Sequence, residues 1–181
     1  VADEGAELRK KGITTPIIVM NPEQHSYKTI IEYNLEPEIY SSRVLDLFCS
    51  ELLKSGHTEP FPIHIKLETG MHRLGFSEED FDDLITRLNK YNVVVKSIFS
   101  HLATADMPEE KDYVFEQLKT FEDNSQQLIN SLGYQPIRHI LNSSGILNFS
   151  DYQYDMVRIG IGMMGIAYND YFQKLLNALY C

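Results

Sequence analysis

The segment Lys66–Phe76 combines residue types that can bind an anion. Lys66 ends an apolar strand pattern, and Arg73 follows it in a loop flanked by Gly70 and Gly75. Two cations held together need an anion, a cofactor oxygen or a modified lysine between them, because like charges repel and burial penalises each one. The alternative is an ordinary turn between a strand and a helix, with a solvated arginine. The first interpretation predicts an anion site that uses Lys66 and Arg73.

Three histidines, His64, His101 and His139, lie in or next to predicted strands. His101 directly follows the strand Val93–Phe99, and the carboxyl end of a parallel strand is where barrel enzymes place functional groups. The alternative for a single histidine is a purely structural role. A metal site needs a His-x-His pair or a bridging carboxylate, and neither accompanies these residues. We therefore predict that the chain binds no metal.

A third group of polar residues lies further along the chain. Asn142 and Ser143 lead from a strand into a short helix, where they either cap the helix or help to bind an anion. Arg158 stands between apolar residues and needs a buried acceptor. Gly160 lets backbone N–H groups approach a ligand closely, together with the following Ile161. Barrel enzymes often build a phosphate site from such loops and a short helix.

Strand and helix patterns alternate along the chain and must position these residues. The pattern predicts strands at Ile17–Met20, Glu38–Tyr40, Ile63–Leu67, Val93–Phe99, Ile137–Leu141 and Met156–Ile159. It predicts helices at Glu4–Lys11, Glu23–Tyr33, Ser42–Ser55, Glu78–Lys90, Lys111–Leu132, Ser144–Phe149 and Phe172–Tyr180. Strands separated by helices indicate an α/β fold with a parallel sheet.

Two parallel architectures fit this order, a doubly wound open sheet and a (β/α)8 TIM barrel. His64, Lys66 and Glu68 share one face of their strand because strand side chains alternate. A polar row suits a barrel whose interior opens into a site at its carboxyl-end mouth. About six strands are predicted where a closed barrel needs about eight. We therefore predict an incomplete barrel that occupies residues 1–181 and was cut from a longer protein.

Charge and composition exclude several classes of partner. The net charge is −10 in 181 residues, which argues against nucleic acid and an anionic membrane surface. No apolar run approaches the roughly 20 residues that span a bilayer. Cys49 and Cys181 do not make a disulfide framework, and no signal peptide is visible, so we predict a cytoplasmic protein.

At this point the sequence resembles the alanine racemase family. Lys66–Phe76 is similar to that family's lysine-x-acid-threonine-glycine-methionine-x-arginine-leucine-glycine stretch, with Glu68 where aspartate is usual. The segment 100–106 resembles its histidine-x-alanine-threonine-alanine-aspartate motif. Asn142, Ser143 and the segment 158–161 match its later cofactor contacts at the expected spacing, and the resemblance covers essentially the whole chain.

The resemblance implies a role in binding pyridoxal 5'-phosphate for each of these residues. Arg158 faces the pyridine nitrogen, and His101 packs beside the ring and hydrogen-bonds Arg158. Arg73 binds the phenolic oxygen and the substrate carboxylate, with Lys66 behind it, in many relatives as a carbamate. Ser143, Gly160 and Ile161 hold the phosphate, with Asn142 beside them.

The resemblance also implies that the parent protein interconverts L- and D-alanine for peptidoglycan, as a homodimer, by proton transfer between two bases. The family's Schiff-base lysine lies on a first barrel strand and its tyrosine base in a C-terminal β-domain, and neither is in this chain, so the chain alone is expected to be inactive. Ile159 and Met164 replace a common proline and tyrosine. The alternatives are a related amino-acid decarboxylase, a non-catalytic pyridoxal-phosphate protein and a barrel used only for binding.

Overall fold

A computed structural model describes residues 1–167, 169–171 and 173–174 and has an α/β fold. Its five strands are β1 (Ile18–Val19), β2 (Glu36–Ile39), β3 (Phe61–Lys66), β4 (Val93–Phe99) and β5 (Ile137–His139). Its α-helices are α1 (Ala2–Lys10), α2 (Tyr27–Glu32), α3 (Ser42–Ser55), α4 (Phe81–Lys90), α5 (Lys111–Leu132) and α6 (Ser143–Asn148). The strands form one sheet in chain order, and every neighbouring pair is parallel.

Local sequence signals fix the ends of the longer helices. The Ser41 hydroxyl accepts a hydrogen bond from the Val44 N–H, which caps the start of α3. Gly56 and Gly133 end α3 and α5 in the left-handed conformation, at φ 72° and 74°, which costs glycine little because it has no Cβ. The predicted bounds of both helices are confirmed.

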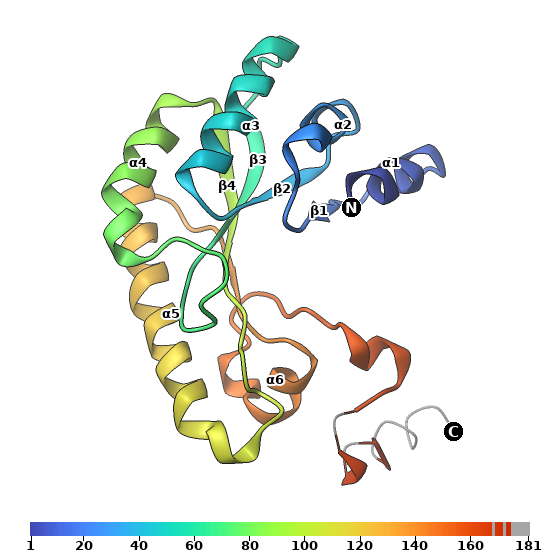
Figure 1. Ribbon diagram of the computed structural model, residues 1–181, viewed down its shortest axis with the longest axis vertical. Coiled ribbons are helices and arrows are strands. Elements are labelled where there is room, and N and C mark those ends of the chain that lie inside the picture. The colour runs from blue at the N-terminus through green and yellow to red at the C-terminus, as the bar shows by residue number, and fades with distance from the viewer. Residues whose placement is uncertain (168, 172, 175–181) are drawn as a thin grey trace.

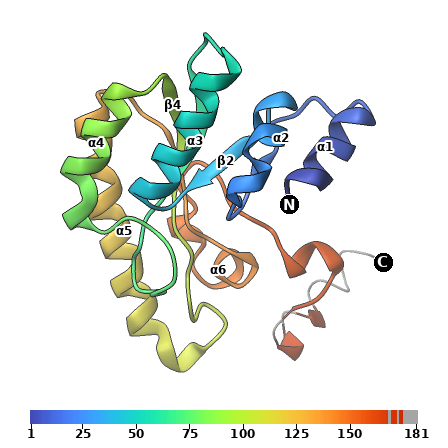
Figure 2. The ribbon, with the colours of Figure 1, turned by 45° about the horizontal axis from the view of Figure 1, so that its top comes forward.

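The helices lie on the outer side of the sheet and follow one another along an arc from α1 to α5 (Figure 1). Figure 2 shows the same succession from a second direction. Large apolar side chains of the helices and of the outward face of the strands are buried between these layers, among them Phe48, Phe121, Ile63, Ile65 and Ile98. A curved parallel sheet with helices on its outside is the arrangement of part of a TIM barrel.

The inner face of the sheet is polar, as the sequence predicted. Glu38, His64, Lys66, Ser97 and His139 are each at most 6% exposed. They alternate along the strands with the apolar residues that face the helices. Glu68, by contrast, is not part of this row, because β3 ends at Lys66 and the Glu68 side chain turns into the next loop.

The described residues form five strands, and the prediction of a sixth at Met156–Ile159 is wrong. The Asp155 N–H, just before this segment, donates to the Arg138 carbonyl of β5, and the Arg158 N–H donates to the Leu141 carbonyl beyond the end of β5. The Asp155 carboxylate takes the Arg138 N–H at 2.8 Å, so a side chain replaces the backbone carbonyl that a strand partner would supply. Of the predicted helix Phe172–Tyr180, residues 172 and 175–180 lie outside the described residues.

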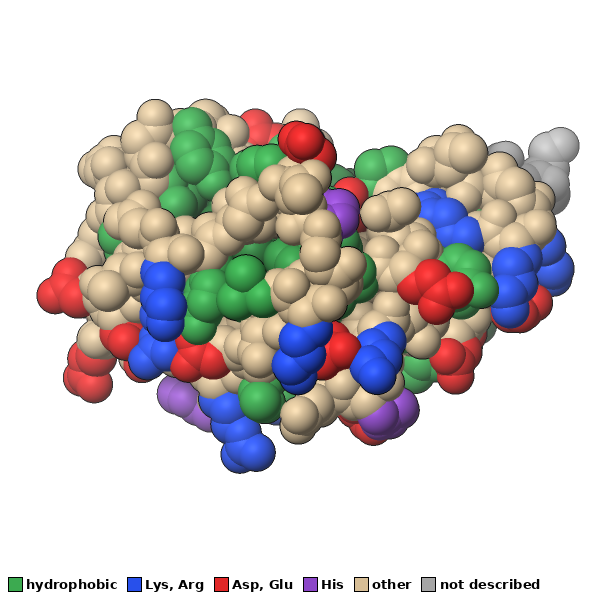
Figure 3. All heavy atoms as spheres, turned by 90° about the horizontal axis from the view of Figure 1, so that it is seen from above, with side chains coloured by type: hydrophobic (Ala, Val, Ile, Leu, Met, Phe, Trp, Pro, Cys, Tyr) green, Lys and Arg blue, Asp and Glu red, His purple; other side chains and the backbone are tan. Residues whose placement is uncertain are grey.

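The surface carries side chains of both charges, and the described cysteine, Cys49, is buried. On the face in Figure 3, Lys and Arg side chains alternate with Asp and Glu side chains. In the part of the chain that the structure describes, no helix combines the length and apolar character needed to cross a bilayer. Cys49 is buried in α3, and burial raises the pKa of its thiol to about 12, so the thiol stays protonated. Cys181 lies outside the described residues.

Candidate functional site

The loop that follows β3 is held in shape by its own acid and glycine. The Glu68 carboxylate accepts hydrogen bonds from the backbone N–H groups of Gly70 and Arg73. Burial raises the pKa of Glu68, but these backbone donors outweigh it, and the pKa lies below its ordinary value. Gly75 has φ +139°, and a Cβ there would lie 2.4 Å from the Glu68 nitrogen. Only glycine fits this turn, which leaves Arg73 exposed to solvent.

A buried carboxylate balances the charge of Lys66. The Lys66 Nζ lies 3.1 Å from the Glu38 Oε1, and the two side chains are 7% and 1% exposed. The other Glu38 oxygen accepts a hydrogen bond from the Asn21 backbone. Glu38 is therefore an anion beside Lys66, whereas the sequence predicted an anion shared by Lys66 and Arg73, and Glu38 pairs with Lys66 alone of these two.

Arg158 is the most highly connected side chain of the inner face. Its guanidinium donates to the Ser100 carbonyl at 2.5 Å, to His139 Nδ1 at 2.5 Å and to His101 Nδ1 at 3.3 Å. The aromatic ring of Phe99 lies 5.2 Å from the guanidinium carbon. These groups are the buried acceptors that the sequence predicted. Burial lowers the pKa of Arg158 to about 10, which still leaves it protonated at neutral pH.

The two histidines that contact Arg158 are neutral. Burial, followed by the charge of Arg158, lowers the pKa of His139 to about 3. The same causes, with smaller contributions from Lys66 and Arg73, lower the pKa of His101 to about 4. Since an arginine N–H can only donate, the Nδ1 atom of His139 is an acceptor and the proton of this ring is on Nε2, which faces the Ser97 hydroxyl.

Asn142 and Ser143 join α6 to the glycine loop. The Asn142 side chain accepts from the Gly145 N–H at 2.9 Å and so caps α6. The Ser143 Oγ accepts from the N–H groups of Gly160 at 2.9 Å and Gly162 at 3.2 Å. A Cβ on Gly162 would lie 3.3 Å from this hydroxyl. The two glycines therefore leave a shallow cradle above the serine that larger residues would fill.

One cavity of about 320 Å³ brings most of the predicted residues together. It is lined by His101, Asn142, Ser143, Ser144, Arg158, Ile159, Gly160 and Ile161. Lys66 and Arg73 do not line it, although their charges reach His101. No group of side chains in the described ranges has the composition of a metal site. The cavity therefore contains the Arg158 cation, the neutral His101 imidazole, the hydroxyls of Ser143 and Ser144, and the backbone of residues 159–161.

Comparison with known proteins decides what kind of domain contains this cavity. Residues 1–168 match the family described as alanine racemase, N-terminal domain. The chain belongs to the alanine racemase family. The alanine racemase of Nostoc sp. is 37% identical over 171 residues, which is 90% of this chain and 43% of that protein.

Solved alanine racemases have the same fold as this chain. The enzyme of Clostridium difficile 630 is 31% identical, with a TM-score of 0.83 over 93% of this chain and 44% of that one. The alanine racemase of a D-cycloserine-producing Streptomyces lavendulae is 25% identical, with a TM-score of 0.87 over 98% and 47%. This alanine racemase domain thus spans less than half the length of its relatives, and the incomplete barrel predicted from the sequence is confirmed.

Sequence reasoning missed three inner-face residues of this racemase domain, Glu36, Glu38 and Ser97. Glu36 and Glu38 alternate around Pro37 within β2, which places both carboxylates on one face, whereas the predicted strand began only at Glu38. That spacing was a usable signal, because acids on an inward strand face need partners.

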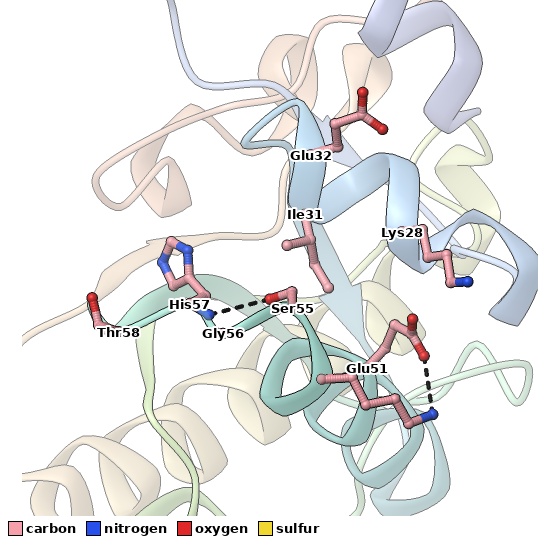
Figure 4. Close-up of a pocket in the computed structure, with 9 residues that line it drawn as sticks. Lys28, Ile31, Glu32, Glu51, Ser55, Gly56, His57 and Thr58 are labelled. Carbon is pink, nitrogen blue, oxygen red and sulfur yellow. Dashed lines mark hydrogen bonds and ion pairs between the residues drawn. The ribbon is translucent and has the colours of Figure 1, made fainter.

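A larger hollow lies elsewhere in the described part of the racemase domain, between α2 and the C-terminal end of α3 (Figure 4). It measures about 770 Å³, and its lining includes Lys28, Glu51, Lys54 and His57. Glu51 and Lys54 pair with each other at 3.2 Å on one helix face, and Lys54 is 69% exposed. This is an open surface groove without a buried polar group, so the smaller cavity beside Arg158 is the candidate site.

Proposed function

We propose that the protein containing this chain is an alanine racemase that interconverts L- and D-alanine, and that this domain supplies one wall of its pyridoxal 5'-phosphate site. Membership of the family carries the proposal, together with the position of Arg158. A cation that cannot give up its proton, held by neutral imidazoles at the end of a 320 Å³ cavity, supports it. The product D-alanine would serve peptidoglycan synthesis in the cytoplasm.

The residues present fit the cofactor. The Ser143 hydroxyl accepts from the backbone N–H groups of Gly160 and Gly162, so its own proton can be donated to a phosphate beside Gly160 and Ile161. Arg158 presents a cation that donates hydrogen bonds and accepts none. Pyridoxal phosphate, when bound, supplies an electron sink for the pair left by removal of the Cα proton. Asn142 supports the cradle by capping the helix that carries Ser143.

Arg158 limits how strong that sink becomes. Beside the pyridine nitrogen of the bound cofactor, Arg158 would donate a hydrogen bond without giving up its proton, so that nitrogen would stay unprotonated. A weaker sink favours return of the proton to Cα, as racemisation requires. His101 keeps Arg158 in place, and Arg73, which is solvent-exposed, orients the substrate carboxylate. The acid and base that move the Cα proton belong to the flanking parts of the homodimeric enzyme.

The test uses the whole protein that contains this chain. We expect it to bind pyridoxal phosphate, detected by visible absorbance, and to racemise L-alanine, detected by circular dichroism. Arg158→Gln is expected to lower the rate by roughly 100-fold, the range for an electrostatic catalytic group. The exposed Arg43→Gln serves as the matched control and keeps the rate. Cofactor binding without turnover of either alanine enantiomer would retain the barrel assignment and reject the racemase in favour of a decarboxylase or a cofactor-handling protein.

A further inference from the structure

A line of hydrogen bonds crosses the inner face of the sheet and ends at Arg158. Glu36 on β2 lies 2.7 Å from His64 Nε2 on β3. His64 Nδ1 lies 2.6 Å from the Ser97 hydroxyl on β4, which lies 3.0 Å from His139 Nε2 on β5. His139 Nδ1 lies 2.5 Å from the Arg158 guanidinium. Four neighbouring strands, β2 to β5, thus contribute one side chain each to this line of hydrogen bonds.

Glu36 and Arg158, the groups at the two ends of this line, determine which atom donates in each of its hydrogen bonds. The Arg158 N–H groups only donate, so His139 Nδ1 accepts and its Nε2–H donates to Ser97. The Ser97 hydroxyl has one proton, which must then go to His64 Nδ1. The remaining His64 proton lies on Nε2 and points at the Glu36 carboxylate, which only accepts. The donor end and the acceptor end therefore select the same arrangement.

The opposite arrangement contains a clash. If His64 carried its proton on Nδ1, Ser97 would donate to His139 Nε2, and His139 would carry its proton on Nδ1 against Arg158. Two donors would then face each other at the 2.5 Å contact. His64 and Ser97 are 4% and 1% exposed, so water does not freely replace a lost partner.

We propose that Glu36 is a positioning residue for Arg158, acting through His64, Ser97 and His139. Its carboxylate accepts from His64 Nε2–H, so His64 Nδ1 accepts from Ser97 and Ser97 accepts from His139 Nε2–H. The His139 Nδ1 atom is then free to accept from the Arg158 guanidinium. The Glu36 side chain is 14% exposed and belongs to an element that does not line the cavity. The functional meaning of this line rests on the proposed racemase activity, whereas the proton arrangement does not.

The proton arrangement is measured first, on whole protein labelled with 15N-histidine, at pH 7.5 and without cofactor. Long-range 1H–15N spectra report which ring nitrogen carries the proton, and single replacements of His64 and His139 assign the signals. We expect both rings to be neutral with the proton on Nε2. A protonated ring, or a proton on Nδ1 of either ring, in the unaltered protein would overturn the proposal.

Two substitutions separate the accepting group from the charge. Glu36→Gln keeps an oxygen acceptor and is expected to retain the Nε2–H signals. Glu36→Met leaves the His64 Nε2–H without its acceptor, so the line can reverse in molecules in which Arg158 moves off His139, and mixed forms of His139 are expected. With pyridoxal phosphate and alanine, Glu36→Met is expected to lower kcat roughly 10- to 100-fold, as a displaced catalytic group does, with little change in KM. The exposed Glu59→Gln is the control and keeps both readouts. Unchanged His139 signals in Glu36→Met would refute the positioning role, even if the protein proved not to be a racemase.

Discussion

Mild acid is expected to destabilise the folded protein through His139. The pKa of this residue is about 3 in the folded state, because the ring is buried beside Arg158, against an ordinary value of 6.5. Between pH 6.5 and 3 the unfolded chain binds a proton at this position and the folded chain does not. Stability therefore rises with pH across that window and falls as the pH is lowered through it.

The size of the effect follows from the two pKa values. Lowering the pH from 7.5 to 5.5 protonates about nine-tenths of the unfolded-state ring and almost none of the folded-state ring. The free energy of unfolding then falls by about 1.4 kcal/mol for His139 alone. His101, with a folded pKa of about 4, adds a loss of similar size. Most carboxylates stay ionised above pH 5.5, so they contribute little to this change.

Urea unfolding at pH 7.5 and 5.5 measures this loss. His139→Gln removes the titrating ring and is expected to reduce the drop by about 1.4 kcal/mol, whatever it does to stability at pH 7.5. His25→Gln changes a histidine that is 79% exposed and should keep the full drop. An identical drop in the protein with and without His139 would refute the assignment of a buried, neutral His139.

Three further outcomes follow from single contacts in the structure. Lys66→Met is expected to lower the free energy of urea unfolding by about 3–5 kcal/mol, because it leaves the Glu38 carboxylate buried without a counter-charge; adding Glu38→Gln should recover most of this loss. Gly75→Ala is expected to cost more than about 3 kcal/mol in thermal unfolding, whereas Gly133→Ala, with open space around it, should cost about 1–2 kcal/mol. Gln117→Leu removes the acceptor of a loop N–H beside His101 and is expected to cost about 1–3 kcal/mol in urea, with faster hydrogen exchange in that loop.

Elements with strong local signals could be predicted from the sequence. The bounds of α3, α5 and β4 match the prediction, because a serine cap, two terminal glycines and a β-branched run mark them. The segment Met156–Ile159 has the same apolar pattern as a strand. It does not form a ladder because Asp155 occupies the hydrogen-bonding position of its neighbour, and that contact joins residues far apart in the sequence.

The candidate site could be predicted only in part, for a related reason. Arg158, His101 and Ser143 stand out because their residue types recur at the ends of strands and in a recognisable order. Glu36 and Glu38 do not, since an acid in a short strand is usually solvated. Their partners come from the next strand, so the ion pair and the hydrogen-bonded line become visible only once the register of β2 against β3 is known.

The order of the strands also bears on how the domain is made. Each strand pairs with the one synthesised before it, and a single helix separates most neighbours along the chain. On the ribosome, each new strand–helix unit can therefore dock on a completed one without waiting for distant sequence. Arg158 follows all five strands in the chain, so the rings that hold its guanidinium are already on finished strands when it emerges. Within the described residues, the cavity residues that follow β5 are therefore added to strands that have already paired.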